Sequence, residues 1–239
     1  MSLLDLANRH IDEIAAIRRD IHANPELGFE EVRTSALIAG KLREWGIETH
    51  EKVGNTGVGG VVRGRRAGAG AIGLRADMDA LALCEQNTLG HASTVRGRMH
   101  ACGHDGHTAM LLGAAQALAE NPDFEGTVHL IFQPAEEGRG GALAMLEAQL
   151  FERFPCDRIF GMHTMPALPL GQFGIRSQAM MAASGRWQVR FNGTGGHGGA
   201  YPHLSTDLSV VLAHFILALR SIVSRNVAPT HPATISVGH

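Results

Sequence analysis

The sequence predicts an α/β fold in which helices cover a mixed, largely parallel sheet, and three observations support this. Short strand-like segments alternate with helix-like segments between residues 30 and 162, which is the order expected of a helix-covered sheet. Chemically reactive residues directly follow several of the strand-like segments. The chain has 239 residues, 44% of them hydrophobic, which is enough for a substantial core.

The first part of the chain contains two expected helices and three expected strands. Apolar residues recur at helical spacing over Leu3–Ile21 and again over Glu30–Trp45, where Gly46 ends the pattern. The segments that follow are short and rich in β-branched residues or interrupted by glycine, as strands joined by tight turns are. These expected strands are Ile47–Val53, Gly57–Val62 and Ala71–Arg75.

The alternation continues through the middle of the chain. Asp105 is the expected N-cap of an Ala- and Leu-rich helix that runs to Leu118, because its carboxylate can accept unpaired amide hydrogens. A buried strand is expected at Thr127–Phe132, a helix at Gly140–Gln149 and a strand at Arg158–Met162.

The pattern changes from about Ala182, which indicates a second domain. We expect a strand, a glycine-rich loop, a long helix and a last strand, which together form a β-α-β piece of an α+β domain. Their ranges are Arg186–Asn192, Gly193–Gly199, Ser205–Arg225 and Thr234–Val237. The expected domains are therefore residues 1–181 and the partial domain 182–239.

Composition limits the partners and the location of the chain. A formal net charge of −2 gives no global attraction for nucleic acid or an anionic membrane, so a small molecule is the expected partner. The N-terminus lacks a cleavable signal pattern, and we expect no apolar stretch of the roughly 18 residues that a membrane span needs. These features predict a cytoplasmic protein. The three cysteines form no pairing pattern, so one of them can be a metal ligand.

A thiol, imidazoles and paired carboxylates indicate a hydrolytic metal centre. Cys102 and His104 are two residues apart in a glycine-rich loop, and in an extended segment such side chains point the same way. Glu136 and Glu137 follow a buried strand, where two adjacent acids are costly unless each has a task, because their like charges raise the pKa of one of them. His163 ends another strand, where a metal can serve as its partner.

At these residues the sequence resembles the hippurate hydrolase and indole-acetyl-amino-acid hydrolase branch of the metallo-aminoacylase and carboxypeptidase superfamily. The resemblance lies in six blocks that occur in the family's order between Arg18 and His239. They are RRDIHANPELGFEE, GLRADMDAL, GRMHACGHDGHT, LIFQPAEEG, GMH and GGHGGAYPHLSTD. The resemblance implies a zinc-exopeptidase-like catalytic domain and an inserted lid domain through which the chain forms a homodimer.

The same resemblance implies a set of site residues. It assigns two divalent ions, manganese or zinc, to a site with Glu136 as the general base. Asp79 corresponds to an acid that orients a ligand, and His197 to a lid histidine that stabilises the oxyanion across the dimer. The implied metal ligands are Cys102, His104, Glu137 and His163. The implied reaction is cleavage of the amide of an N-acyl amino acid by a metal-activated water.

Three alternatives remain open at this point. Family members continue past the position of His239 and supply a final histidine ligand, so this chain is expected to lack that ligand. A truncated, catalytically silent module that binds metal or forms oligomers is therefore one alternative. A second is an N-acetyldiaminopimelate-type deacetylase, and a third is a purely structural zinc site. His22, His100 and His107 are expected to pack or to support ligands rather than to react.

Overall fold

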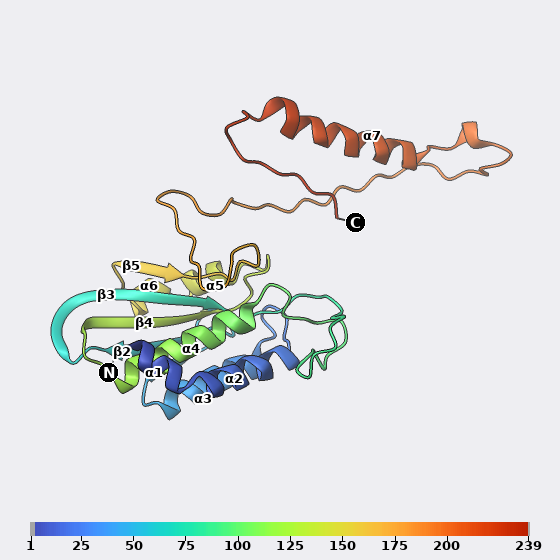
Figure 1. The fold of residues 1–239 in the computed structure, drawn as a ribbon. Coiled ribbons are helices and arrows are strands. Elements are labelled where there is room, and N and C mark those ends of the chain that lie inside the picture. Colours follow the sequence, from blue (N-terminus) through green and yellow to red (C-terminus); the bar gives the residue numbers. More distant parts are fainter. Residues whose placement is uncertain (1–2, 239) are drawn as a thin grey trace. The chain divides into compact units, whose positions relative to one another are not determined.

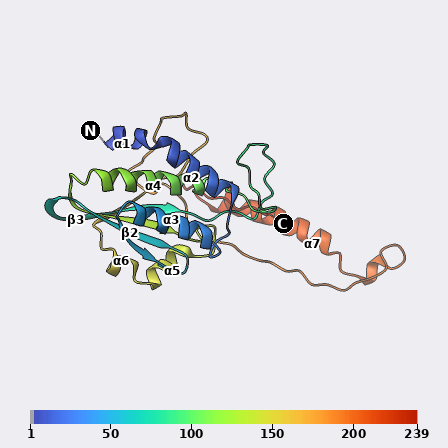
Figure 2. The same ribbon diagram turned by 90° about the horizontal axis from the view of Figure 1, so that it is seen from below.

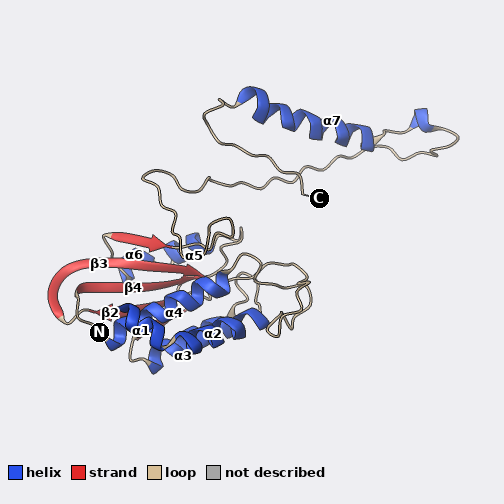
Figure 3. Cartoon of the chain, in the orientation of Figure 1, coloured by secondary structure: helices blue, strands red, loops and turns tan. Residues whose placement is uncertain are grey.

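The computed structural model describes residues 3–238, and the chain divides into two compact units after Ala167. The sequence pattern placed the domain boundary later, at residue 181. The first unit contains the sheet and most of the helices (Figures 1 and 3). Its helices are α1 Leu3–Arg9, α2 Ile11–Ala23, α3 Val32–Glu44, α4 His104–Glu120, α5 Gly141–Glu147 and α6 Leu150–Arg153. Its strands are β1 Glu48–Glu51, β2 Val58–Arg63, β3 Arg66–Asp77, β4 Glu125–Gln133 and β5 Arg158–Gly161.

The sheet is mixed and mostly parallel, as the sequence predicts. Its order is β1-β2-β4-β3-β5. Strand β3 pairs in parallel with both β4 and β5, whereas β2 pairs antiparallel with β4 and with β1. Among the described strands, β2 alone therefore runs against the others. The carboxyl ends of β3, β4 and β5 consequently lie at the same edge of the sheet.

Helices cover both faces of this sheet (Figure 2). Side chains alternate between the two faces of a strand, and β4 shows this directly. Its Val128, Leu130 and Phe132 belong to the larger core with α2, α3 and α4. The intervening Ile131 belongs to a smaller core with Met145 of α5. The structure confirms the expected α/β class.

Several element boundaries in the first unit differ from the expectation. The first helix divides at His10 into α1 and α2. Helix α4 begins at His104, so the expected N-cap role of Asp105 is wrong. Gly103 is the N-cap residue, and Asp105 lies inside the first turn with its side chain fully buried. That carboxylate instead pairs with Arg18 Nε at 2.6 Å and with His22 Nδ1 at 2.8 Å.

The second unit contains the short 3-10 helix Pro202–Leu204, helix α7 Leu208–Ser221 and a π-helical turn at Ile222–Asn226. Asp207 is the N-cap residue of helix α7, and its carboxylate accepts the backbone N–H groups of Ser209 and Val210. The strands expected at 186–192 and 234–237 are wrong, because neither segment joins a strand ladder in the described chain. An extended segment becomes a strand only when its backbone groups pair with a neighbour.

One continuous helix of the described chain, Leu208–Asn226, is long and apolar enough to cross a membrane by length and composition alone. It has 19 residues, and an 18-residue window within it has a mean hydropathy of 1.6. By helix length and hydropathy, the expectation that the chain has no apolar stretch long enough to span a membrane is therefore wrong. The physical reason is that no formally charged side chain interrupts the run between Asp207 and Arg220. The cytoplasmic location stays a prediction.

Candidate metal centre

Three loops of the first unit meet at the carboxyl edge of the sheet. In the parallel ladders, Asp77 at the end of β3 is level with Gln133 at the end of β4, and Arg75 is level with Gly161 at the end of β5. The residues that follow these strands therefore emerge side by side. The guanidinium of Arg75 joins two of the strand ends, because it donates to Gln133 Oε1 at 2.7 Å and to Asp77 Oδ2 at 2.6 Å.

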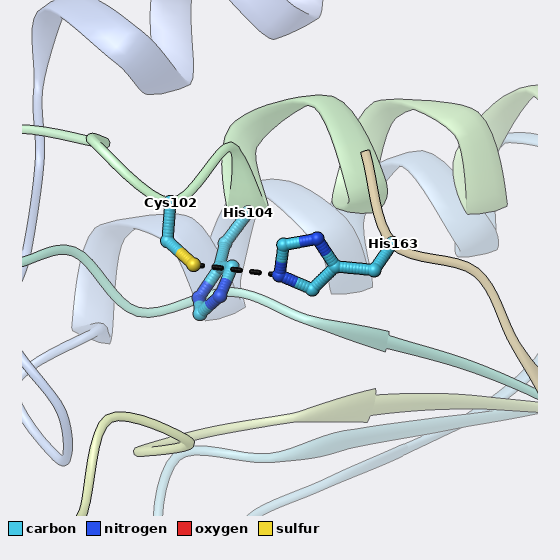
Figure 4. Close-up of side chains that lie close together, drawn as sticks. All are labelled: Cys102, His104 and His163. Carbon is cyan, nitrogen blue, oxygen red and sulfur yellow. Dashed lines mark hydrogen bonds between the residues drawn. The ribbon is translucent and has the colours of Figure 1, made fainter. Parts of the chain in front are cut away.

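The start of α4 brings Cys102 and His104 to this edge. Gly103 between them has a φ of 89°, a left-handed conformation that glycine adopts at little cost. A Cβ atom at this position would lie 2.7 Å from Thr164 Oγ1, so a side chain would also collide with the segment after β5. Figure 4 shows Cys102, His104 and His163 with their side chains pointing toward one another.

Asp79 orients His104 and also binds the loop after β4. Its Oδ1 lies 3.1 Å from His104 Nδ1, and its Oδ2 accepts the backbone N–H of Glu137 at 3.0 Å. The carboxylate keeps the Nδ1 side of the imidazole occupied. The Nε2 atom of His104 is buried and has no hydrogen-bond partner among the described residues.

The loop after β4 is strained and firmly held. Ala135 has a φ of 50°, which is unusual for a residue with a side chain. Its N–H donates to the buried Glu31 carboxylate at 2.8 Å. Gly141 packs so closely on this loop that a Cβ atom would lie 1.6 Å from the Pro134 carbonyl oxygen. This arrangement leaves Glu136 exposed and Glu137 partly buried.

His163 lies in the segment that follows β5. Its Nδ1 donates to the carbonyl oxygen of Thr164 at 2.7 Å, and its Nε2 lies 3.4 Å from Cys102 Sγ. The Nε2 atom thus faces Cys102 and can accept from its thiol.

The structure brings the sequence-predicted residues of the first unit together in two groups that share His104. One ligand atom each from Cys102, His104 and His163 lies within 4.8 Å of the others, and the same holds for His104, Glu136 and Glu137. The roles of these residues as ligands or base stay predictions. His197 belongs to the second unit, where its Nδ1 accepts the N–H groups of Gly199 and Ala200, and its oxyanion role also stays a prediction.

Negative charge accumulates in the cluster and shifts its pKa values. Burial and the nearby Glu137 raise the pKa of the Cys102 thiol to about 12. Burial opposes protonation of His104, but the hydrogen bond to Asp79 and the charges of the surrounding carboxylates raise its pKa overall. Both shifts favour the protonated forms of the thiol and the imidazole, and a bound divalent cation would favour the deprotonated forms that act as ligands.

Two buried atoms without hydrogen-bond partners in the described chain indicate that the donor set fits divalent ions. Both His104 Nε2 and Glu137 Oε1 are buried without a hydrogen-bond partner among the described residues, and they lie 3.9 Å apart. Buried polar atoms of this kind are costly unless another group binds them. Mixed sulfur, nitrogen and oxygen ligation is compatible with zinc and with other transition metals.

Sequence reasoning assigned no role to Asp77 and gave His107 only a packing or supporting role. In the structure His107 Nδ1 donates to Asp77 Oδ1 at 2.6 Å, and both residues are buried beside His104. Two signals could have pointed to them. Asp77 alternates with Asp79 at a strand end, and His107 lies three residues after His104 on the same helix.

Comparisons with known proteins find similar sequences and a similar structure. A model of peptidase family M20/M25/M40 matches residues 73–237. Hippurate hydrolase of Campylobacter jejuni is 49% identical over 226 residues, which are 95% of this chain and 58% of that protein. N-acetyldiaminopimelate deacetylase of Oceanobacillus iheyensis is 41% identical over 227 residues, with coverages of 95% and 60%. The chain thus spans less than two thirds of the length of these relatives.

A solved structure shows the same similarity. The crystal structure of a Bacillus subtilis protein, described as a dinuclear metal binding peptidase from the M20 family, aligns with a TM-score of 0.67 and 43% identity. The alignment covers 71% of this chain and 47% of the other.

Proposed function

The chain belongs to peptidase family M20/M25/M40, and from that membership we propose that it acts as a metal-dependent amidohydrolase on N-acyl amino acids. The membership rests on the family match over residues 73–237 and confirms the resemblance seen in the sequence blocks. The hippurate-like substrate class is proposed from the relative that is a hippurate hydrolase. A small acylated amino acid also suits a chain whose net charge is only −2.

The observation that carries the proposal is a pair of buried atoms, His104 Nε2 and Glu137 Oε1, which have no hydrogen-bond partner among the described residues and lie beside a second acid, Glu136. Glu136 neighbours Glu137 in the chain but is exposed, so it can contact water and substrate. A purely structural ion requires a closed ligand set and no such adjacent acid. The arrangement therefore supports a reactive centre better than a structural one.

In the proposed reaction Glu136 removes a proton from the attacking water, whose oxygen bonds to the amide carbon. Glu136 then donates the proton to the leaving amine, which separates as the amide C–N bond breaks. Cys102, His104, Glu137 and His163 would hold the divalent ions, with manganese and zinc as the proposed metals. Divalent ions bound there would supply Lewis acidity for both water activation and carbonyl polarisation.

A second substrate class has specific support. The relative from Oceanobacillus iheyensis is an N-acetyldiaminopimelate deacetylase at 41% identity, so an acetylated diamino acid is the competing substrate. Both reactions use the same amide chemistry and differ in the groups on either side of the bond. We propose further that the second unit carries the lid, including His197, and that it joins two chains as a homodimer.

The test is hydrolysis by the purified chain loaded separately with Mn²⁺ and Zn²⁺. Released amino acid is measured with hippurate, N-acetyl amino acids and N-acetyldiaminopimelate as substrates. Turnover of hippurate above that of N-acetyldiaminopimelate supports the proposal, and the reverse order supports the deacetylase. Metal binding without turnover of any substrate would identify a catalytically silent metal-binding module.

A further inference from the structure

We propose that His107 is a positioning residue, which sets the place and the ring orientation of His163 through the backbone of Thr164. The inference rests on the proposed metal centre, and it gives a specific target to a residue for which the sequence predicts only packing or support of a ligand. His107 lies one turn after His104 on α4 and is almost completely buried, with 2% of its surface exposed.

Both ring nitrogens of His107 have partners. Nε2 accepts the backbone N–H of Thr164 at 2.9 Å, so in the neutral ring the hydrogen must reside on Nδ1. Nδ1 donates to Asp77 Oδ1 at 2.6 Å. Asp77 is itself held, because its other carboxylate oxygen accepts from Arg75 Nη1 at 2.6 Å. The ring of His107 is therefore fixed on two sides by groups of the strand ends.

The backbone of Thr164 links His107 to His163. Its N–H binds His107, and its carbonyl oxygen accepts from His163 Nδ1 at 2.7 Å. That second bond keeps the hydrogen of His163 on Nδ1, so Nε2 is the acceptor that faces Cys102, at 3.4 Å from Sγ. The two imidazole rings lie 4.5 Å apart at an interplanar angle of 66°. A shift of Thr164 would therefore move the proposed ligand atom.

His163 lies in an exposed segment, so other residues must hold its side chain in position. The residue is exposed, and it follows strand β5, whose four residues are exposed as well. The hydrogen bonds from buried His107 fasten this exposed segment to the first two turns of α4, which also contain His104. Helix α4 thus contains one proposed ligand, His104, and holds the loop segment that contains the other, His163.

A direct metal role for His107 is the competing interpretation. Asp77, His104 and His107 form a third group whose ligand atoms lie within 4.8 Å of one another. However, the Nδ1 and Nε2 atoms of His107 are both engaged, and Asp77 already binds Arg75 and His107. An ion in that group would have to break these bonds, whereas His104 Nε2 has no hydrogen bond to break among the described residues.

Two substitutions of similar shape test the contacts of the two ring nitrogens of His107 separately. In His107→Gln the side-chain carbonyl reaches about the place of Nε2 and can still accept the Thr164 N–H. In His107→Asn the amide lies near the place of Nδ1, so it can reach Asp77 but not Thr164. Thr164→Val is the matched control, since it keeps the backbone N–H and removes only the hydroxyl, which lies 3.2 Å from Nε2.

The readout is Co²⁺ binding to the metal-free chain, measured by its visible absorption and by equilibrium dialysis. The thiolate and d–d bands report on the ligand geometry without any substrate. We expect His107→Asn to weaken Co²⁺ binding by about 10–100-fold and to change the spectrum, as loss of a group that orients a ligand does. His107→Gln and Thr164→Val should stay within a few-fold of the unmodified protein.

Other outcomes overturn the inference. Unchanged Co²⁺ affinity and spectrum in a folded His107→Asn variant would show that His107 does not position the ligand. Loss of one ion per chain in both His107 variants would identify His107 as a direct ligand. Failure of the proposed function gives a different result. The chain then hydrolyses no substrate but still binds Co²⁺, and His107→Asn still changes the Co²⁺ affinity and spectrum.

A measurement on the unmodified chain keeps the inference testable if a variant does not fold. Long-range ¹H–¹⁵N correlation spectra of the metal-free protein report which ring nitrogen of each histidine carries the hydrogen. We expect the Nδ1–H form for both His107 and His163. The Nε2–H form at either residue would overturn the proposed chain of contacts.

Discussion

Asp79 Oδ1 lies 3.1 Å from His104 Nδ1, and both side chains are buried at the carboxyl edge of the sheet. This contact fixes which nitrogen of His104 is left for a metal. Because Oδ2 of the same carboxylate accepts the Glu137 N–H, one side chain positions two proposed ligands. A carboxylate that accepts on both oxygens cannot be replaced by an amide without losing one of these bonds.

Asp79→Asn is therefore expected to weaken divalent metal binding by about 10–100-fold. The amide nitrogen of Asn can accept neither the His104 N–H nor the Glu137 N–H. Isothermal titration with Zn²⁺ measures the effect, and Asp123→Asn is the control because Asp123 is largely exposed. Equal affinities for the two variants would contradict the orienting role of Asp79.

Glu136→Gln is expected to reduce kcat by about 10²–10⁴-fold while metal content stays unchanged. The substitution removes the proton acceptor and keeps the size of an exposed side chain. Steady-state hydrolysis of hippurate together with metal analysis provides the measurement. Glu152→Gln, on the exposed surface of α6, should behave like the unmodified chain. A Glu136→Gln chain that turns over normally would remove Glu136 from the mechanism.

Metal binding should become tighter as pH rises. With a pKa near 12, the Cys102 thiol is protonated at neutral pH in the metal-free protein, and a metal binds the thiolate. Binding must therefore release a proton, so the affinity should increase about tenfold per pH unit for this one group. Calorimetry in buffers of different ionisation enthalpy measures the release.

Cys102→Ser should release about one proton fewer than the unmodified protein under the same conditions. Cys84→Ser is the matched control, because Cys84 is an exposed thiol outside the candidate centre. Proton release that is the same in Cys102→Ser as in Cys84→Ser would show that Cys102 is not a ligand.

His100 is expected to make the fold sensitive to mild acid. Burial lowers its pKa to about 4, and both ring nitrogens are buried without a hydrogen-bond partner among the described residues. The unfolded chain, with a histidine pKa near 6.5, binds the proton first as pH falls. Stability is thus fully present above about pH 6.5 and declines toward pH 4, by roughly 3 kcal/mol in total for this group.

His100→Leu should remove this part of the pH dependence, because no proton can bind at that position in either state. It should also be tolerated at pH 7, since no hydrogen bond is lost. Urea unfolding at several pH values measures the slope. Ile38→Val, in the same unit, should lower stability by about 0.5–1.5 kcal/mol without changing the slope. A slope retained in His100→Leu would contradict the assignment.

The mostly parallel order of the sheet followed from local patterns in the sequence, because strand and helix periodicity depend on neighbouring residues. The Cys102 and His104 pair and the Glu136 and Glu137 pair could be recognised for the same reason. Two secondary-structure predictions for the second part of the chain were wrong. The expected strands at 186–192 and 234–237 have no paired partner in the described chain, and pairing depends on residues far away in the sequence.

By itself, the sequence determined the residue types of the candidate centre and their position after strand ends. Only the tertiary structure decided how they are supported. The contacts of Asp79 with His104 and of His107 with Thr164 join positions 25 and 57 residues apart. No local periodicity encodes such contacts, because they arise when parallel strands and a helix N-terminus come together at one edge. Tertiary packing therefore determines which nitrogen of each histidine remains free to bind a metal.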